Sequence, residues 1–516
     1  MMGGRSHIRR RFCRLDKAKG APLLRWGSPK RQMLKTVCKL WRHFVTPFGS
    51  YAALRDGQVQ LLERVVGSKG LVMDADRLAV ANADWTGQYR GNAEVLVAPS
   101  SSDEVLQVIK ACVAERLPLC IQGGNTSLVG GSVPARDELI LSTSKLNRIL
   151  HFDESSGVLN CEAGCILETL NSHVGQSGYM MPFDLAARGS CMIGGNVATC
   201  AGGLHLLRFG PLYGHVLGLE VVVPLEGGQK LNMLSSLRKD NSTFRLANLF
   251  IGSEGQLGIV TQVSICAVPR PLTRNVAFLG CLTFQDCLRL LHLIRVRLGP
   301  LLSSVEFVDQ DCLNCVKEHM KLSNPVATSC PFYLLIETMG FNQDNDGQTT
   351  YAAIEQCLEE GHAADGVFAE SETQARELWK LRELVSEAFS HDGYNYKYDV
   401  SLPIHKYYEI VEKCKDNFGV ECVRVGGFGH LGDGNIHLNI TSKCPSDSLK
   451  KRMDDFVYKW TTENNGSISA EHGIGQLKLH YWHMSRPTAV LRQCVAMKRH
   501  FDPSWILNPY KTLQNV

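Results

Sequence analysis

Three glycine-rich strings, each close to apolar strand-like segments, restrict most strongly what this chain can fold into. They span Gln122–Pro134, Ala187–Gly203 and Ile251–Thr261. Backbone N–H groups freed by glycine can converge on an anion, and small hydroxyl groups add donors without crowding it. The first string is neither G-x-G-x-x-G nor a Walker loop, because no GKS or GKT follows. One such string would be an ordinary turn, whereas three favour a long nucleotide, such as a flavin dinucleotide, bound along one domain.

Hydrophobic periodicity changes character near Pro269–Pro271, which suggests two large domains. Before this point the expected helices are Val59–Val66 and Asp103–Glu115, and the expected strands are Glu94–Ala98, Pro118–Ile121, Glu138–Ser142, Val216–Val223 and Leu249–Ile265, with a hairpin over Arg148–Cys161 that turns at Ser155–Gly157. Beyond it the expected strands are Val276–Leu279 and Phe332–Glu337, and the expected helices are Ala375–Phe389, Tyr407–Phe418 and Leu449–Trp460. The second half therefore indicates an α+β domain. No run of 18 apolar residues is present, so we expect no membrane span.

Basic residues concentrate at the start of the chain. Residues 1–55 hold 14 Lys and Arg but a single acid, Asp16, while the remainder is net acidic. An Arg-rich, acid-poor segment of amphipathic character is typical of a mitochondrial transit peptide, and the alternative is a basic tail with no targeting role. A basic tip on an acidic body argues against a nucleic-acid-binding protein. We expect a transit peptide over 1–45, a helical segment over 46–89 and a location in the mitochondrial matrix.

The 19 cysteines are scattered and odd in number, which fits a reducing compartment better than a disulfide framework. Cys312 and Cys315 form a lone C-x-x-C without a second pair at zinc-ribbon spacing. Packing on a helix accounts for this pair better than a redox or metal site does.

The segment Gly426–Ile440 carries a candidate metal site. His430 and His437 flank a Gly-Asp-Gly turn that can fold two strand segments together, and Ser467–Gly475 supplies Glu471 and His472. Two His and one carboxylate form a catalytic zinc set with open positions, although iron or manganese would accept the same ligands. The alternative is that these histidines are hydrogen-bonded core residues.

A candidate carboxylate clamp lies upstream. Arg382 and Ser386 are four residues apart in the expected helix Ala375–Phe389 and so share a face. Lys397 follows in an extended segment. Arg offers a bidentate fork, Ser a hydroxyl donor and Lys a point charge, although the composition alone would favour a solvated surface helix.

The three glycine-rich strings, in this order and spacing, resemble the FAD-binding domain of the vanillyl-alcohol oxidase / p-cresol methylhydroxylase flavoproteins over about Arg90–Arg270. The resemblance implies an α+β fold with a two-lobed FAD-binding domain over 90–270, a C-terminal α+β substrate or cap domain with an antiparallel sheet over 271–500, and a return segment to the flavin over 501–516. It implies FAD contacts from Gly123, Gly124, Asn125, Thr126, Ser127, Ser190, Gly194, Gly195, Asn196, Thr199, Gly202, Gly203, Gly258 and Ile259. No histidine in these loops matches the one that binds FAD covalently in some members, so we expect non-covalent FAD.

The second half resembles the C-terminal domain of the FAD-linked D-lactate and D-2-hydroxyglutarate dehydrogenases. The resemblance implies that His430, His437 and Glu471 hold a divalent metal, expected to be zinc, and that Arg382, Ser386, Lys397, Asn439 and His472 bind the substrate. It also places Asn508 and Lys511 of the terminal Leu507–Leu513 near the flavin.

These assignments imply a hydroxy-acid dehydrogenase. The metal would acidify the substrate hydroxyl, His472 would take its proton, and flavin N5 would accept the hydride. A clamp for a second carboxylate favours D-2-hydroxyglutarate, oxidised to 2-oxoglutarate, over D-lactate or D-malate. The family implies electron-transfer flavoprotein as the electron acceptor. Two competing hypotheses are a flavin-binding homologue without turnover and an alkyl-transfer flavoenzyme.

Three positions depart from the expected pattern. Cys200 replaces an Asn, Ser127 replaces a Gly and Ser386 replaces a Thr. Loss of the amide at Cys200 would alter FAD binding if that amide contacts the flavin. Ser386 keeps the hydroxyl, so its role should survive.

Overall fold

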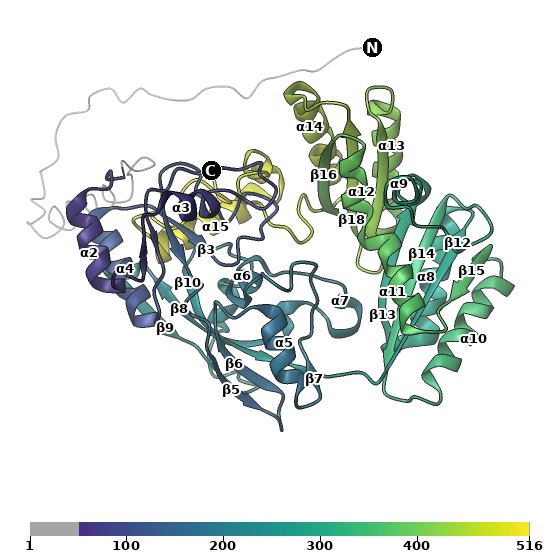
Figure 1. Ribbon diagram of the computed structural model, residues 1–516, viewed down its shortest axis with the longest axis horizontal. Coiled ribbons are helices and arrows are strands. Elements are labelled where there is room, and N and C mark those ends of the chain that lie inside the picture. Colours follow the sequence, from purple (N-terminus) through teal and green to yellow (C-terminus); the bar gives the residue numbers. More distant parts are fainter. Residues whose placement is uncertain (1–50, 515–516) are drawn as a thin grey trace, which may run out of the picture. The chain divides into compact units, whose positions relative to one another are not determined.

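The structure is a computed structural model that describes residues 51–514 (Figure 1). The expected transit peptide over 1–45 and the start of the segment over 46–89 lie outside the described residues. The described chain begins with α2 (Asp56–Val66) and α3 (Ala75–Ala81). Among the described residues no helix is long and apolar enough to cross a membrane.

The first sheet has four short strands in the order β1-β2-β4-β3. These are β1 (Leu71–Val72), β2 (Leu96–Val97), β3 (Leu119–Gln122) and β4 (Leu139–Ser142). The helix α4 (Ser102–Glu115) begins at Ser101, whose side chain accepts a hydrogen bond from the Glu104 N–H, and buries Val105, Val108 and Ile109 beside α2. The first glycine-rich string leaves this sheet at the end of β3.

A second, antiparallel sheet of five strands follows in the order β5-β6-β10-β8-β9. Its strands are β5 (Ile149–Asp153), β6 (Val158–Glu162), β8 (Val216–Val223), β9 (Gln229–Asn232) and β10 (Ile259–Cys266). Packed with it are α5 (Leu167–Gly175) and α6 (Ile193–Thr199), whereas the short α7 (Leu206–Phe209) lies against β13 (Leu302–Asp309) of the later sheet and places Leu207 on its core. A two-stranded ladder joins β7 (Tyr179–Met180) to β11 (Val268–Pro269). The second glycine-rich string thus forms α6 and the turn after it, which places its backbone N–H groups at a helix start.

The later half is built on a seven-stranded antiparallel sheet in the order β15-β12-β14-β13-β17-β18-β16. Its strands are β12 (Thr273–Cys281), β13 (Leu302–Asp309), β14 (Phe332–Gly340), β15 (Asp365–Phe368), β16 (Tyr394–Ser401), β17 (Arg424–His430) and β18 (Asn435–Ser442). Its helices are α8 (Phe284–Leu298), α9 (Gln310–Met320), α10 (Asp346–Glu359), α11 (Glu372–Glu383), α12 (Val385–His391), α13 (Glu409–Phe418) and α14 (Asp447–Glu463). The last helix, α15 (Thr488–Phe501), packs instead with the first half of the chain, where Phe501 contacts Phe250.

The alternation of side chains along this sheet separates two cores. Tyr396, Tyr398 and Val400 join the core of α8, α10, α13 and α14, whereas α9, α11 and α12 cover the other face. Because neighbouring residues of a strand point to opposite faces, Asn395, Lys397 and Asp399 face the side of α11 and α12. This face carries the polar residues of the site.

Two expected elements differ from the structure. Only the second half of Leu249–Ile265 is strand, because residues 249–258 form the end of a 3-10 turn and a glycine-rich loop before β10. The expected helix Ala375–Phe389 is also interrupted, since Leu384 has φ −84° and ψ 0° and separates α11 from α12. Arg382 and Ser386 therefore belong to two successive helices, although they still line one cavity.

The C-terminal segment returns to the first sheet. Leu507 makes a single parallel bridge to Leu119 of β3. Lys498, which is fully buried, donates hydrogen bonds to the carbonyls of Gln256 and Leu507 and to the Asp502 carboxylate. The cation thus ties α15 and the return segment to the loop that precedes β10.

Candidate active site

The glycine-rich loops enclose a cavity of about 310 Å³. Of the residues expected to bind the cofactor, those that line it are Gly123, Gly124, Asn125, Thr126, Ser127, Gly194, Gly195, Asn196, Thr199, Gly202, Gly258, Ile259 and Asn508. Gly124 is required sterically, because a β-carbon there would overlap the carbonyl oxygen of Ser190. Loops far apart in sequence therefore meet around one space, and we call it the cofactor cavity.

Several polar side chains of these loops hold the loops together. Asn125, with φ +54°, donates to the Ala83 carbonyl and accepts from the Ser132 hydroxyl. The Ser127 oxygen accepts from the Val129 and Gly131 N–H groups, so this departure from Gly adds a turn contact. Because their side chains are used within the loops, Asn125 and Ser127 offer a ligand their backbone groups.

Three predicted positions lie differently from the rest. Ser190 does not line the cofactor cavity and Gly203 lines the neighbouring one. Cys200 ends α6 with φ +50° and does not line either cavity. Asn adopts this left-handed conformation more readily than Cys, so the departure at Cys200 bears on the loop backbone. Lys511 is buried and its ammonium donates to Cys120 Sγ and the Gly131 carbonyl.

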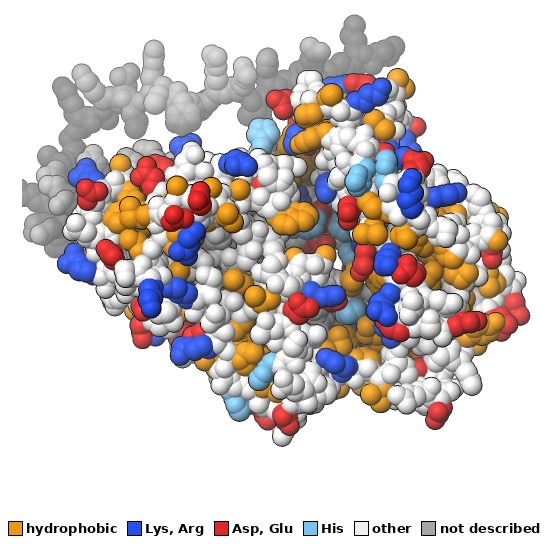
Figure 2. Space-filling view, in the orientation of Figure 1, with side chains coloured by type: hydrophobic (Ala, Val, Ile, Leu, Met, Phe, Trp, Pro, Cys, Tyr) orange, Lys and Arg blue, Asp and Glu red, His pale blue; other side chains and the backbone are white. Residues whose placement is uncertain are grey.

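A second cavity, of about 690 Å³, adjoins the first. We call it the substrate cavity. It is lined by all the predicted metal and substrate residues: Arg382, Ser386, Lys397, His430, His437, Asn439, Glu471 and His472. Glu471 and His472 line both cavities. Figure 2 shows a hollow in which histidine and acidic side chains are visible.

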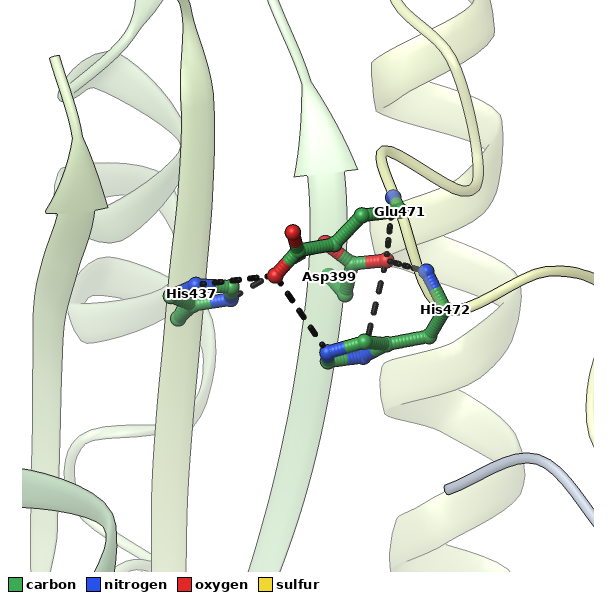
Figure 3. A group of neighbouring side chains, drawn as sticks. All are labelled: Asp399, His437, Glu471 and His472. Carbon is green, nitrogen blue, oxygen red and sulfur yellow. Dashed lines mark hydrogen bonds and ion pairs between the residues drawn. The ribbon is translucent and has the colours of Figure 1, made fainter. Parts of the chain in front are cut away.

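Three imidazoles surround one carboxylate oxygen where the cavities meet. Glu471 Oε1 lies 3.9 Å from His430 Nε2, 3.8 Å from His437 Nε2 and 3.6 Å from His472 Nε2. Figure 3 shows His437 on its strand and His472 on its loop, on either side of Glu471, and their rings are nearly parallel at 5.8 Å. The ligand atoms of His437, Glu471, His472 and Asp399 all lie within 4.8 Å of one another, so this donor set fits a divalent metal bound at about 2.0–2.2 Å. His430 is not part of that group and approaches it at Glu471.

The hairpin of β17 and β18 positions both strand histidines. His430 pairs with Asn435, and His437 lies two residues further along β18, so both face the same side of the sheet. Burial lowers the pKa of His437 well below its usual range, and nearby His430 and Arg382 lower it further. This imidazole is neutral, which is the form that binds a metal.

Glu306 of β13 connects the metal and carboxylate-binding groups. Its side chain is buried, with Oε1 2.8 Å from His430 Nδ1 and Oε2 accepting from Arg382 Nε at 2.7 Å. Although burial raises the pKa of Glu306, His430 and Arg382 bring it to about 2. Burial lowers the pKa of His430, but Glu306 raises it to about 9, so metal binding would displace a proton from this ring. A carboxylate behind a ligand histidine fixes the ring orientation.

Asp399 of β16 organises the loop that carries Glu471 and His472. Its Oδ2 accepts from the N–H groups of Ala470, Glu471 and His472 at 3.2, 3.1 and 3.0 Å. Asn435 donates to Oδ1 at 2.9 Å. Burial raises the pKa of Asp399, but His472, Lys478 and His437 hold it far below its usual range. Although Asp399 lies among possible ligands, its Oδ2 is occupied by the loop backbone, so we regard it as a positioning residue.

The opposite side of this loop is held by Glu254, which lines the cofactor cavity. Its carboxylate accepts from the N–H groups of Ile474 and Gly475 at 2.9 and 2.8 Å. Asn508 donates to the Glu254 carbonyl and accepts from the Ile121 N–H. In addition, the Gly203 N–H donates to Glu471 Oε2 at 3.2 Å. The loop with the third metal ligand is thus fixed from both halves of the chain.

Buried polar atoms without partners indicate where ligands would bind. Asn196 Oδ1 in the cofactor cavity and Asn439 Nδ2 in the substrate cavity make no hydrogen bond within residues 51–514. Leaving such atoms unsatisfied costs about 1–3 kcal/mol each, so a ligand that pairs with them is favoured. Both cavities therefore fit bound molecules with polar groups.

Another group of possible ligands, Cys315, His319 and Asp392, is better explained as an ion-pair cluster. Arg424 Nε donates to Asp392 Oδ2 at 2.7 Å, and His319 lies 2.7 Å from the other oxygen. Burial, with the nearby Asp392, raises the pKa of Cys315 to about 12. A protonated thiol beside a guanidinium is a poor metal ligand, and Cys312 and Cys315 are packed on α9 as expected.

Comparisons with known proteins agree with this architecture. The chain matches the FAD binding domain over residues 93–229 and the C-terminal domain of FAD linked oxidases over residues 270–512. It is 47% identical to the mitochondrial D-2-hydroxyglutarate dehydrogenase of Danio rerio over 86% of this chain and 82% of that protein. It is 46% identical to the Bos taurus protein of the same name over 90% of this chain and 84% of that one.

Among solved structures, p-cresol methylhydroxylase has a TM-score of 0.70 at 15% identity, covering 89% of this chain and 98% of that one. Together with the two family matches, this likeness confirms the expected p-cresol methylhydroxylase-type fold, an FAD-binding domain followed by a further α+β domain. The presence of an FAD-binding domain and the family resemblance are confirmed as well. The chain belongs to the family of FAD-linked D-2-hydroxyglutarate dehydrogenases.

Proposed function

We propose that this protein oxidises D-2-hydroxyglutarate to 2-oxoglutarate with non-covalently bound FAD and a divalent metal, zinc being the first candidate. The observation that carries the proposal is the position of Glu471 and His472, which line the glycine-rich cofactor cavity and the substrate cavity at once. His430, His437 and Glu471 would hold the metal at this junction. The names of the relatives support the same substrate.

The spacing of strand residues supports a five-carbon diacid. Asp399 pairs with His437, and Lys397 pairs with Asn439 on the next rung of the same face. Two residues of antiparallel strand span about 7 Å. Four bonds separate the two carboxyl carbons of 2-hydroxyglutarate. In an extended chain with the length per bond of a polypeptide backbone, these two carbons lie about 5 Å apart. A substrate held at the metal would therefore bring its distal carboxylate toward Lys397 and Asn439, and Arg382 and Ser386 line the same cavity.

The distal cations are suited to a carboxylate. Lys397 is exposed on β16 and lines the substrate cavity, and desolvation by the surrounding protein lowers the pKa of its ammonium. Arg382 uses Nε for Glu306 and has further N–H groups on its guanidinium. A monocarboxylate such as D-lactate would leave the remaining N–H groups of the buried Arg382 guanidinium without a substrate partner, which is a basis for rejection.

His472 is our candidate for the base. Its Nδ1 lies 3.5 Å from Asp399 Oδ2, which favours the N–H on that nitrogen and leaves a lone pair on Nε2 at the cavity. Bound metal would supply Lewis acidity to the substrate hydroxyl, and bound FAD would accept the hydride. His472 would take the hydroxyl proton, and Asn439 would orient the substrate.

The relatives are named as mitochondrial, and the basic residues 1–45 are consistent with import, so we assign the protein to mitochondria and place it in the matrix. Electron-transfer flavoprotein is the acceptor we propose, on the basis of the family resemblance.

Anaerobic reduction of the flavin tests this proposal. D-2-hydroxyglutarate should bleach the flavin absorbance, and D-lactate should do so far less efficiently. Arg382→Ala should reduce the preference for D-2-hydroxyglutarate over D-lactate by at least about tenfold, the value of one charged hydrogen bond. Arg376→Ala, an exposed position of α11, is the matched control. No bleaching by any D-2-hydroxy acid, or an unchanged preference in Arg382→Ala, would refute it.

A further inference from the structure

The loop 471–475, which carries the third proposed metal ligand, is held by a carboxylate from the other half of the chain. Glu254, in the third glycine-rich string, accepts from the Ile474 N–H through Oε1 at 2.9 Å and from the Gly475 N–H through Oε2 at 2.8 Å. Gly473 leaves room for this carboxylate, because a β-carbon there would lie 2.9 Å from Glu254 Cδ. The side chain of Glu254 thus fits against the three residues that directly follow the metal and substrate groups of this loop.

The backbone of Glu254 belongs to the wall of the cofactor cavity. Its N–H donates to the Ala198 carbonyl of α6 at 2.7 Å, and its carbonyl accepts from Asn508 Nδ2 at 2.9 Å. The Thr512 hydroxyl of the return segment also donates to Glu254 Oε2, at 2.9 Å. Glu254, Ala198 and Asn508 all line the cofactor cavity. One residue therefore connects the metal-site loop to the second glycine-rich string and to the return segment.

The conformation of Glu254 indicates that its contacts fix it in place. Its φ of +50° lies in the left-handed region, which a residue other than glycine adopts at a cost of about 1 kcal/mol or more. Each hydrogen bond to a carboxylate contributes about 1.5–3 kcal/mol, so the three side-chain bonds offset that cost. Neutral contacts from the Gly203 N–H and the Gln476 amide also join this loop to the other two glycine-rich strings. Some connection between the two cavities should therefore survive without Glu254.

We propose that Glu254 couples the binding of FAD to the binding of the metal, so that each raises the affinity of the protein for the other. This inference rests on the proposed function, because it assumes the same cofactor and the same metal ligands. When those ligands hold an ion, the loop 471–475 is fixed against Glu254, and the wall of the cofactor cavity is fixed with it. Coupling between two binding sites is reciprocal and typically changes each affinity by about 5–150-fold. Glu254 is then a positioning residue, which acts on the metal site through the loop.

The dissociation constant of FAD tests the coupling without turnover. It is read from the fluorescence of free flavin on serial dilution of the holoenzyme, with Zn²⁺ bound and after a chelator has removed it. Removal of Zn²⁺ should raise the dissociation constant about tenfold in wild type but less than about threefold in Glu254→Gln and Glu254→Asp. The amide of Gln can accept from only one of the two backbone N–H groups, because its NH2 group faces the other. Asp keeps the charge and adopts the left-handed conformation more readily, but its side chain is one methylene too short for the loop.

Glu138→Gln is the matched control for the loss of a carboxylate that holds a loop. Glu138 is fully buried and accepts from the N–H groups of Ala135 and Arg136, in the same half of the chain as Glu254. Unlike Glu254, it lines neither cavity. This variant should keep the wild-type response of FAD affinity to Zn²⁺ removal even where its stability falls.

The affinity for Zn²⁺ provides the reciprocal readout. Titration of the FAD-loaded protein in graded zinc buffers should give a dissociation constant for Zn²⁺ at least about threefold higher in both Glu254 variants than in wild type. The coupling is overturned if FAD affinity in wild type does not respond to Zn²⁺ removal, or if both Glu254 variants respond as strongly as wild type does. Failure of wild type to bind Zn²⁺, or of D-2-hydroxyglutarate to reduce its flavin, would instead refute the proposed function, since neither binding measurement needs oxidation.

Discussion

Replacing Asp399 by Asn is the most informative perturbation of the site. The side chain keeps its size, but the charge that faces His472 and Lys478 is lost. In the native protein Oδ2 accepts three backbone N–H groups of the loop 470–472, while Oδ1 accepts from Asn435 Nδ2. An asparagine amide has one oxygen, which can accept either from the three backbone N–H groups or from Asn435. Its NH2 group would then face the N–H donors of the other set.

The size of the effect follows from burial. Asp399 is 3% exposed and Lys478 is 1% exposed, so the variant leaves a buried cation without its carboxylate. Breaking such a pair costs about 3–5 kcal/mol of stability. Because the loop carries Glu471 and His472, and Asp399 also lies 3.8 Å from His437 Nδ1, metal affinity should drop as well. Loss of a residue that orients metal ligands costs about 10–100-fold in affinity or activity.

The assay combines metal content after dialysis against a graded chelator, kcat/KM for D-2-hydroxyglutarate and thermal unfolding. Asp309→Asn is the matched control. Like Asp399, this buried carboxylate accepts hydrogen bonds from backbone N–H groups, those of Cys312 and Gly427, and it lies 3.7 Å from a lysine, Lys415 Nζ. Unlike Asp399, it lines neither cavity. The control should lose stability and keep its metal. If Asp399→Asn retained metal and kcat/KM within about twofold of wild type, the organising role of this carboxylate would be wrong.

Three further changes have defined outcomes. Glu306→Gln should lower kcat/KM about tenfold or more, because His430 and Arg382 both lose a charged partner, and unchanged steady-state kinetics would contradict this. Gly202→Ala should reduce metal content, since its β-carbon would lie 2.7 Å from Glu471 Oε2, and full occupancy by elemental analysis would disprove the contact. Burial lowers the pKa of His215 in the folded protein below its usual value of 6.5. Below pH 6.5 the unfolded chain therefore binds a proton that the folded protein does not, and the free energy of unfolding falls as the pH falls. The melting temperature of wild type should therefore drop more between about pH 7.5 and about pH 5.5 than that of His215→Gln, and parallel profiles would refute the assignment.

Local patterns explain which parts of the fold are predictable from the sequence. The Gly-Asp-Gly turn places His430 and His437 on one face of the hairpin because side chains alternate along each strand. The apolar periodicity of α4 and the capping serine at its start likewise mark a helix without tertiary information. The break at Leu384 has no such mark, because Ala375–Phe389 keeps helical periodicity through it.

The supporting residues of the site depend on contacts that no local pattern records. Glu306 is 124 residues from His430, and Glu254 is 220 residues from Ile474. Their roles arise when β13 pairs with β17 and when the loop 471–475 meets the cofactor cavity. One sequence feature does indicate Asp399. It lies two residues after Lys397 in an apolar strand, and because side chains alternate between the two faces of a strand, both must face the same cavity.

Anomalous diffraction from crystals of the FAD-loaded protein, recorded above and below the zinc absorption edge, tests the central claim most directly. We predict one strong anomalous peak, at about 2.0–2.2 Å from the side-chain ligand atoms of His430, His437 and Glu471. A protein that reduces its flavin with D-2-hydroxyglutarate but shows no peak there at any accessible metal edge, or a peak only at Cys315, His319 and Asp392, would contradict it.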